Sequence, residues 1–73
     1  AVGFKFEPEA TKHKLIKRAR MLLKQANLDL VVANTDQKKG YRAYIINHSK
    51  EYGPFLNKLH MAAYLARLLS ERL

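Results

Sequence analysis

The six residues Leu28–Ala33 (L-D-L-V-V-A) constrain the fold of this chain most strongly. Four of the last five are apolar, and two of these are β-branched valines. A near-continuous apolar run of this length is typical of a strand covered on both faces, as in a parallel sheet. The run therefore predicts a buried strand and, with it, covering material on both sides of a sheet.

The residues before this run complete a βαβ pattern. Val2, Phe4 and Phe6 alternate with small or polar residues, which predicts a first strand over residues 1–6. Residues 10–26 change to a helical period, with Pro8 expected to open the helix and Asn27 to end it. A strand, a helix and a second strand in this order predict a right-handed crossover.

The rest of the chain predicts a third strand and a second helix. Residues 41–47 are rich in aromatic and β-branched side chains, residues 48–54 are expected to form a loop, and residues 55–73 a helix capped by Asn57. The expected order is β-α-β-β-α. The last helix has a main apolar stripe and further apolar residues beside it, so we expect it to be buried on two sides. The stripe comprises Leu59, Ala62, Ala63, Ala66 and Leu69 or Leu73, and the neighbours are Met61, Leu65 and Leu68.

Length and composition limit how such a sheet can be stabilised. The chain has 73 residues and no cysteine, so disulfides and cysteine-based zinc sites are excluded. A core of this size is marginal, which favours completion by a partner subunit or by the rest of a larger protein. No apolar run approaches the ~18 residues of a membrane span and no secretion leader is recognisable. We therefore expect a cytoplasmic protein without membrane contact.

The net charge of +8 indicates an anionic partner. Six cations without an intervening acid lie on the first helix: Lys12, Lys14, Lys17, Arg18, Arg20 and Lys24. They favour either a phosphate-facing surface or the solvated side of an amphipathic helix. Neither standard glycine-rich phosphate loop is present, and the three histidines have no metal-site spacing, so no metal site is expected.

Two strand ends are the candidate binding site. Ligands of open parallel sheets lie outside the carboxyl ends of strands, here Gly3-Phe4-Lys5 and Ala33-Asn34. Phe4 offers a ring face to a base, Lys5 a charge to a phosphate, and Asn34 an amide. The alternative is that Phe4 is core, Lys5 points to water and Asn34 caps a turn.

Three segments together resemble a known family. G-F-K-F-E at Gly3–Glu7, A-R-x-x-L at Ala19–Leu23 and L-D-L-V-V-A-N at Leu28–Asn34 resemble the C-terminal part of phosphopantothenoylcysteine synthetase, the phosphopantothenate–cysteine ligase of coenzyme A biosynthesis. In bacteria this enzyme is often the second half of a bifunctional flavoprotein. The resemblance implies a Rossmann-like, mostly parallel sheet, with residues 1–73 as one segment of a ligase domain.

The resemblance also implies a reaction and its partners. ATP or CTP, accompanied by Mg²⁺, activates the carboxylate of phosphopantothenate, and the cysteine amine then forms the amide. Gly3, Phe4, Lys5, Ala33 and Asn34 correspond to the nucleotide-binding positions, the catalytic residues are not identified, and a homodimer of the complete domain is implied. The N-terminal part of the domain would come from a missing segment or a second chain, and residues 1–73 alone should be inactive.

The sequence departs from the family pattern at the helix. Two lysines of the bacterial pattern are replaced by Leu22 and Ala26, which resembles the eukaryotic type and favours ATP. Asn34-Thr35 replaces Asn-Asp, and the stretch before the third strand is shortened to residues 37–40. Two other hypotheses stay open: a small basic nucleic-acid-binding module that uses residues 12–24, and a non-catalytic subunit that docks a partner through its last helix.

Overall fold

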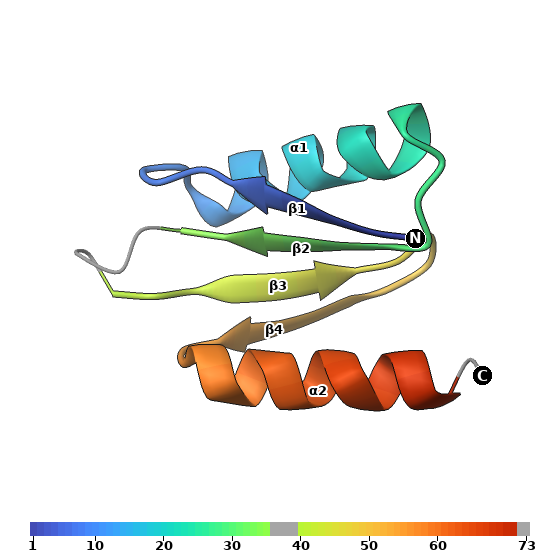
Figure 1. Ribbon diagram of the computed structural model, residues 1–73. Coiled ribbons are helices and arrows are strands. Elements are labelled where there is room, and N and C mark those ends of the chain that lie inside the picture. Colours follow the sequence, from blue (N-terminus) through green and yellow to red (C-terminus); the bar gives the residue numbers. More distant parts are fainter. Residues whose placement is uncertain (36–39, 72–73) are drawn as a thin grey trace.

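The chain forms a four-stranded sheet between two helices (Figure 1). The computed structural model describes residues 1–35 and 40–71. Its elements are β1 (Val2–Phe6), α1 (Lys12–Gln25), β2 (Leu30–Asn34), β3 (Ala43–Ile46), β4 (Glu51–Phe55) and α2 (Lys58–Glu71). The strand order is β1-β2-β3-β4, with β1 and β2 parallel and the other two pairs antiparallel. The α/β class predicted from the sequence is confirmed. The sheet was expected to be mostly parallel, whereas among the described strands only the β1–β2 pair is parallel.

The two helices cover opposite faces of the sheet (Figure 1). Leu15, Ala19 and Leu23 of α1 pack on Val31 of β2 and on its neighbours in β3. Val32, the next residue of β2, belongs to the second cluster, against which α2 packs. Alternate residues of β2 therefore enter two different cores. The prediction that the Leu28–Ala33 run contains a strand covered on both faces is confirmed.

The helix ends follow from local hydrogen bonds. The Thr11 side chain accepts the backbone N–H of Lys14, so Thr11 caps α1 and the prediction that Pro8 opens the helix is wrong. At the other end Asn27 has φ +52°, the left-handed conformation common just beyond a helix. The prediction that Asn27 ends the helix is therefore confirmed. Asn57 accepts the backbone N–H groups of Leu59 and His60 and is the predicted cap of α2.

Residues 51–55 form a strand where the sequence predicted a loop over residues 48–54 and the start of a helix at Phe55. Glu51–Phe55 contains Gly53 and Pro54, and both residue types are depleted in strand interiors. The strand pairs only with β3 in the described part of the chain, and its register shifts between Ala43 and Ile45. An edge strand tolerates proline because its outer N–H groups need no ladder partner. This position explains why the loop prediction was wrong.

Helix α2 presents a different face to the sheet from the one predicted. Its inward side chains are Met61, Tyr64, Leu65 and Leu68. Leu59, at the start of the predicted main stripe, is 78% exposed, and none of the described residues of α2 is fully buried. Only one side of the helix is therefore covered, and its outer apolar side faces solvent. Among the described residues, no helix is both long and apolar enough to cross a membrane.

Candidate functional site

Strands β1 and β2 carry the five predicted site residues side by side. Their parallel register pairs Gly3 with Val31, Phe4 with Val32, Lys5 with Ala33, and Phe6 with Asn34. Both strands run in the same direction, so their carboxyl ends meet at one edge of the sheet. The structure therefore brings the two predicted strand ends together.

The pleat of the strands divides these residues between two faces. Val2 packs in the α2-side cluster, so Phe4 and Phe6, two and four residues on, point to the same side. Phe4 is 65% exposed and Phe6 is 56% exposed, because α2 packs against β3 and β4. Asn34 is half-buried and follows Leu30 and Val32 on this face. The alternative that Phe4 belongs to the core of this chain is wrong.

Gly3 and Lys5 point toward α1. A Cβ added at Gly3 would overlap the Leu28 side chain, so the absence of a side chain there admits Leu28. Lys5 lines a hollow of 150 Å³ together with Arg18, Met21, Leu22 and Gln25 of α1. Its Nζ lies 3.7 Å from Glu7 Oε1. Lys5 thus extends along the outer side of α1 and not toward Phe4.

Ala33 lies beneath α1 and has no exposed surface. It pairs with Lys5 on one side and with Tyr44 of β3 on the other, and its methyl group is in the α1-side cluster. Its side chain is therefore out of reach of a ligand in this chain. The nucleotide-binding role assigned by resemblance to Gly3, Phe4, Lys5, Ala33 and Asn34 stays a prediction.

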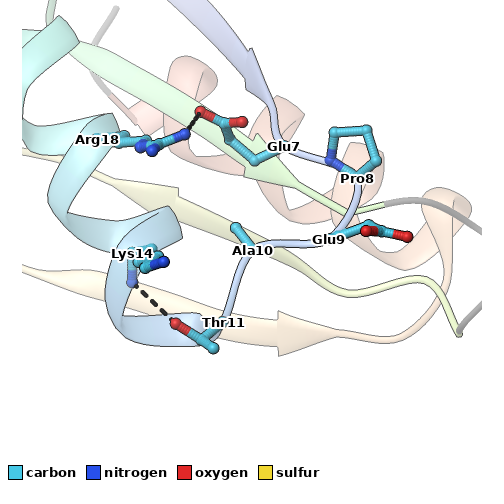
Figure 2. Close-up of a pocket in the computed structure, with 7 residues that line it drawn as sticks. All are labelled: Glu7, Pro8, Glu9, Ala10, Thr11, Lys14 and Arg18. Carbon is cyan, nitrogen blue, oxygen red and sulfur yellow. Dashed lines mark hydrogen bonds and ion pairs between the residues drawn. The ribbon is translucent and has the colours of Figure 1, made fainter.

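An open pocket of 530 Å³ lies between the carboxyl end of β1 and the start of α1 (Figure 2). Its lining residues are Glu7, Pro8, Glu9, Ala10, Thr11, Lys14 and Arg18. Arg18 Nη1 donates to Glu7 Oε1 over 2.6 Å, which ties α1 to the end of β1. This pocket could not be predicted from the sequence, because Pro8 was expected to open the helix, which places residues 8–10 inside it. Only Thr11, a residue type that favours N-caps, signalled the later helix start.

The Arg18 hydrogen bond lowers the pKa of the Glu7 carboxyl below its ordinary value, with Lys5 as a smaller contributor. A carboxyl whose pKa is lower in the folded than in the unfolded chain stabilises the fold above its unfolded pKa. That contribution disappears as the pH falls through the folded pKa.

We therefore expect Arg18→Gln to raise the Glu7 pKa toward its ordinary value. The substitution should also weaken the loss of stability seen when the pH is lowered through about 4. Carbon-detected NMR titration of the glutamate carboxyls checks the pKa, with Glu71 as the internal control. A Glu7 pKa that is the same in both proteins would contradict the Arg18 contact.

The carboxyl end of β2 is tied to β3 by Thr35. The buried Thr35 hydroxyl accepts the backbone N–H of Arg42 over 3.1 Å, and the Thr35 N–H donates to the Arg42 carbonyl. Nearby in the chain, burial raises the pKa of the Tyr41 phenol, whose hydroxyl has no hydrogen-bond partner among residues 1–35 and 40–71. The predicted turn residues 36–39 lie outside the described part of the chain.

The three histidines lie on different elements: His13 on α1, His48 between β3 and β4, and His60 on α2. In the described part of the chain, no cluster of three or more His, Cys, Asp or Glu side chains is placed to hold a metal ion.

The fold is similar to that of a solved flavoprotein. The chain superposes on part of the crystal structure of the DNA/pantothenate metabolism flavoprotein from Streptococcus pneumoniae, with a TM-score of 0.86 and 22% sequence identity. The match covers 99% of this chain and 32% of the other. The likeness establishes the fold. It agrees with the resemblance to the synthetase part of such flavoproteins that was inferred from the three sequence segments.

The two matching chains differ in length. This chain spans about a third of the length of the flavoprotein chain. No protein-family model matches the sequence, and no curated protein shows significant sequence similarity to it.

Proposed function

We propose that this chain is the C-terminal part of a phosphopantothenate–cysteine ligase domain and supplies one wall of its nucleotide site. The observation that carries the proposal is the fold likeness over 99% of the chain to a pantothenate metabolism flavoprotein. The sequence segments that resemble the synthetase family support it from a second direction. Gly3–Phe6 and Leu30–Asn34 form adjacent parallel strands, the arrangement in which both strand ends can face one ligand.

Three unsatisfied surfaces support a larger domain. Strand β1 pairs only with β2 in the described part of the chain, so its other edge has room for a further strand. Phe4 and Phe6 are exposed on the α2 side of this edge strand. The outer side of α2 around Leu59 is apolar and exposed as well. An N-terminal part or a second chain would pair with the free edge of β1 and cover the outer side of α2, the nucleotide base would cover Phe4, and the complete domain would form a homodimer.

In the proposed reaction the substrate carboxylate attacks the α-phosphorus of ATP or CTP. The bond to the β-phosphate breaks, pyrophosphate leaves, and an acyl-nucleotidylate remains. The cysteine amine then attacks the acyl carbon, the nucleoside monophosphate leaves, and the amine loses a proton. Phe4 offers its exposed ring to the base and Asn34 its amide to a polar group on the same face. Lys5 lies on the opposite face, so its ammonium would meet a phosphate that reaches around the carboxyl ends of the strands.

Mg²⁺ would enter with the triphosphate, whose oxygens it prefers. Glu7 does not fit as its ligand, because Arg18 and Lys5 already neutralise this carboxylate. We therefore assign no step of the metal chemistry to this chain.

Lys5 offers a physical replacement for a lysine that the helix lacks. The family pattern has a lysine at the position of Leu22, and Leu22 lines the same hollow as Lys5. A cation moved from the helix to the adjacent strand would thus lie on the same part of the surface. Arg18 lines the hollow too and adds a second positive charge.

We expect Lys5→Gln to weaken nucleotide binding by about tenfold, because a charge-assisted contact to phosphate is lost. Phe4→Ala should weaken it by a similar factor through loss of stacking, about 1–2 kcal/mol. Lys58→Gln, on the exposed start of α2, is the control and should bind normally. The measurement is calorimetric titration of ATP and CTP into the native particle that contains this chain. Equal affinity in all three variants, or no binding of either nucleotide, would overturn the assignment.

A further inference from the structure

A second pocket lies at the opposite end of the sheet. Its volume is 410 Å³, and its lining residues are Lys17, Arg20, Met21, Leu23, Lys24 and His48. His48 sits between β3 and β4, and its Nε2 lies 3.0 Å from the carbonyl of Leu28, which precedes β2. The pocket is therefore near the amino end of β2, whereas the candidate site lies at the carboxyl ends of β1 and β2. We call it the α1–His48 pocket.

The rim of the α1–His48 pocket is cationic. Lys17, Arg20 and Lys24 lie three and four residues apart on α1, so they share one side of the helix. Among the residues that the structure describes, no acidic side chain lines the pocket. Lys17 and Lys24 form no ion pair within residues 1–35 and 40–71. An anion placed between these ammonium groups would relieve their mutual repulsion.

Arg20 is held in place at the rim. Its Nη1 donates to the Asn47 carbonyl over 3.3 Å, and its Nη2 lies 3.8 Å from Glu51 Oε2. Both contacts come from the segment that includes His48, so α1 and the β3–β4 connection are joined across the pocket. A guanidinium has five N–H donors, and these two contacts leave others to meet an oxyanion.

The remaining lining is apolar. Leu23 is buried in the α1-side core, and Met21 is 50% exposed although it is a large apolar side chain. An apolar lining with a few converging polar groups, at a volume of a few hundred Å³, is typical of a small-molecule site. A bare inorganic anion would use the cations but leave Met21 in water.

We propose that the α1–His48 pocket binds a small phosphate monoester that carries an apolar or aromatic group. The phosphate meets Lys17, Arg20 and Lys24, and the apolar group covers Met21. Phe4 and Lys5 do not line this pocket, although Met21 borders both it and the hollow of Lys5. The proposal does not depend on ligase activity.

The test is an NMR titration of the ¹⁵N-labelled chain with phenyl phosphate at about 0.15 M salt, where long-range attraction is screened. Inorganic phosphate and benzyl alcohol each carry half of the proposed recognition. We expect saturable shifts at Met21, Lys24 and His48, with phenyl phosphate bound at least about tenfold more tightly than either half-ligand. Failure of this titration leaves the proposed function intact, since neither Phe4 nor Lys5 lines this pocket.

Two matched double variants distinguish specific binding in the pocket from nonspecific attraction by the positive charge of the chain. Lys17→Gln with Lys24→Gln should weaken phenyl phosphate binding by about tenfold or more. Lys58→Gln with Arg67→Gln removes the same charge from α2 and should leave the affinity unchanged; dispersed amide spectra verify that both variants fold. Equal weakening in both, or no saturation in the wild-type chain, would overturn the proposal. Tighter binding of a thymidine oligonucleotide, with shifts along all of α1, would overturn it in favour of nucleic acid.

Discussion

Leu15→Ala is expected to lower the free energy of unfolding by about 3 kcal/mol, whereas Leu59→Ala should change it by less than about 0.5 kcal/mol. Leu15 has no exposed surface and packs between α1 and the sheet, so its truncation leaves a cavity. Leu59 is 78% exposed on the outer side of α2. A chain of 73 residues has only about 4–11 kcal/mol of stability in total. Leu15→Ala therefore removes a large share of it.

Urea unfolding followed by circular dichroism measures both changes in the same chain. The pair is matched in chemistry, since each variant removes the same atoms from a leucine on a helix. A loss of 2 kcal/mol or more for Leu59→Ala, in the range of a buried leucine, would show that the outer side of α2 is covered in the isolated chain. That result would contradict the assignment of this surface to contacts with further protein.

Gly53→Ala is expected to destabilise the chain by about 3 kcal/mol, and Gly40→Ala by about 1 kcal/mol. Both glycines have positive φ, +124° for Gly53 and +92° for Gly40, so alanine is strained at either position. They differ in their surroundings. A Cβ at Gly53 would lie 2.7 Å from the Ala43 carbonyl oxygen and 3.2 Å from Tyr44 Cδ1, whereas no atom of residues 1–35 and 40–71 is found within 4 Å of one at Gly40.

The difference between the two variants isolates the contact of β4 with β3, because both carry strain from positive φ. Thermal and urea unfolding of the two proteins give this difference. If Gly53→Ala cost no more than Gly40→Ala, the β3–β4 pairing seen at Ala43 would not hold in solution. The sequence predicted a loop at Gly53 and Pro54, where the structure has β4, so this comparison tests that strand directly.

The βαβ part of the fold could be predicted because the apolar residues keep one regular spacing over the whole length of each element. Leu15, Ala19 and Leu23 fall on one side of α1, and the strands before and after it supply the sheet they cover. Helix α2 could not be oriented in this way. Apolar residues occur on nearly all of its sides, so the choice between Leu59 and Leu65 depends on the sheet it meets.

This orientation decides where on α2 the docking hypothesis can be tested. Leu65 and Leu68 pack against the α2-side cluster, so acidic substitutions there would break the fold before they revealed a partner. Leu59, with exposed Ala62 and Ala66, is the surface at which docking can be tested without loss of the fold.

For the candidate site, the sequence predicted which strand ends meet but not on which face of the sheet each side chain lies. The sequence places Phe4 and Asn34 near the ends of two parallel strands, and the structure puts them on the same face of that pair. The pleat directs Gly3, Lys5 and Ala33 to the other face. There the Leu28 side chain fills the space beside Gly3, and α1 covers Ala33. The Glu7–Arg18 pair spans eleven residues and two elements, so no local pattern could have revealed it.

Pyrophosphate release by the native particle that contains this chain tests the central claim most directly. The particle is supplied with ATP or CTP, phosphopantothenate and cysteine, and the isolated 73-residue chain serves as the control. Our proposal predicts release that requires the triphosphate and phosphopantothenate, turns over only with cysteine, and is absent from the isolated chain. A native particle that releases no pyrophosphate with either nucleotide would contradict it.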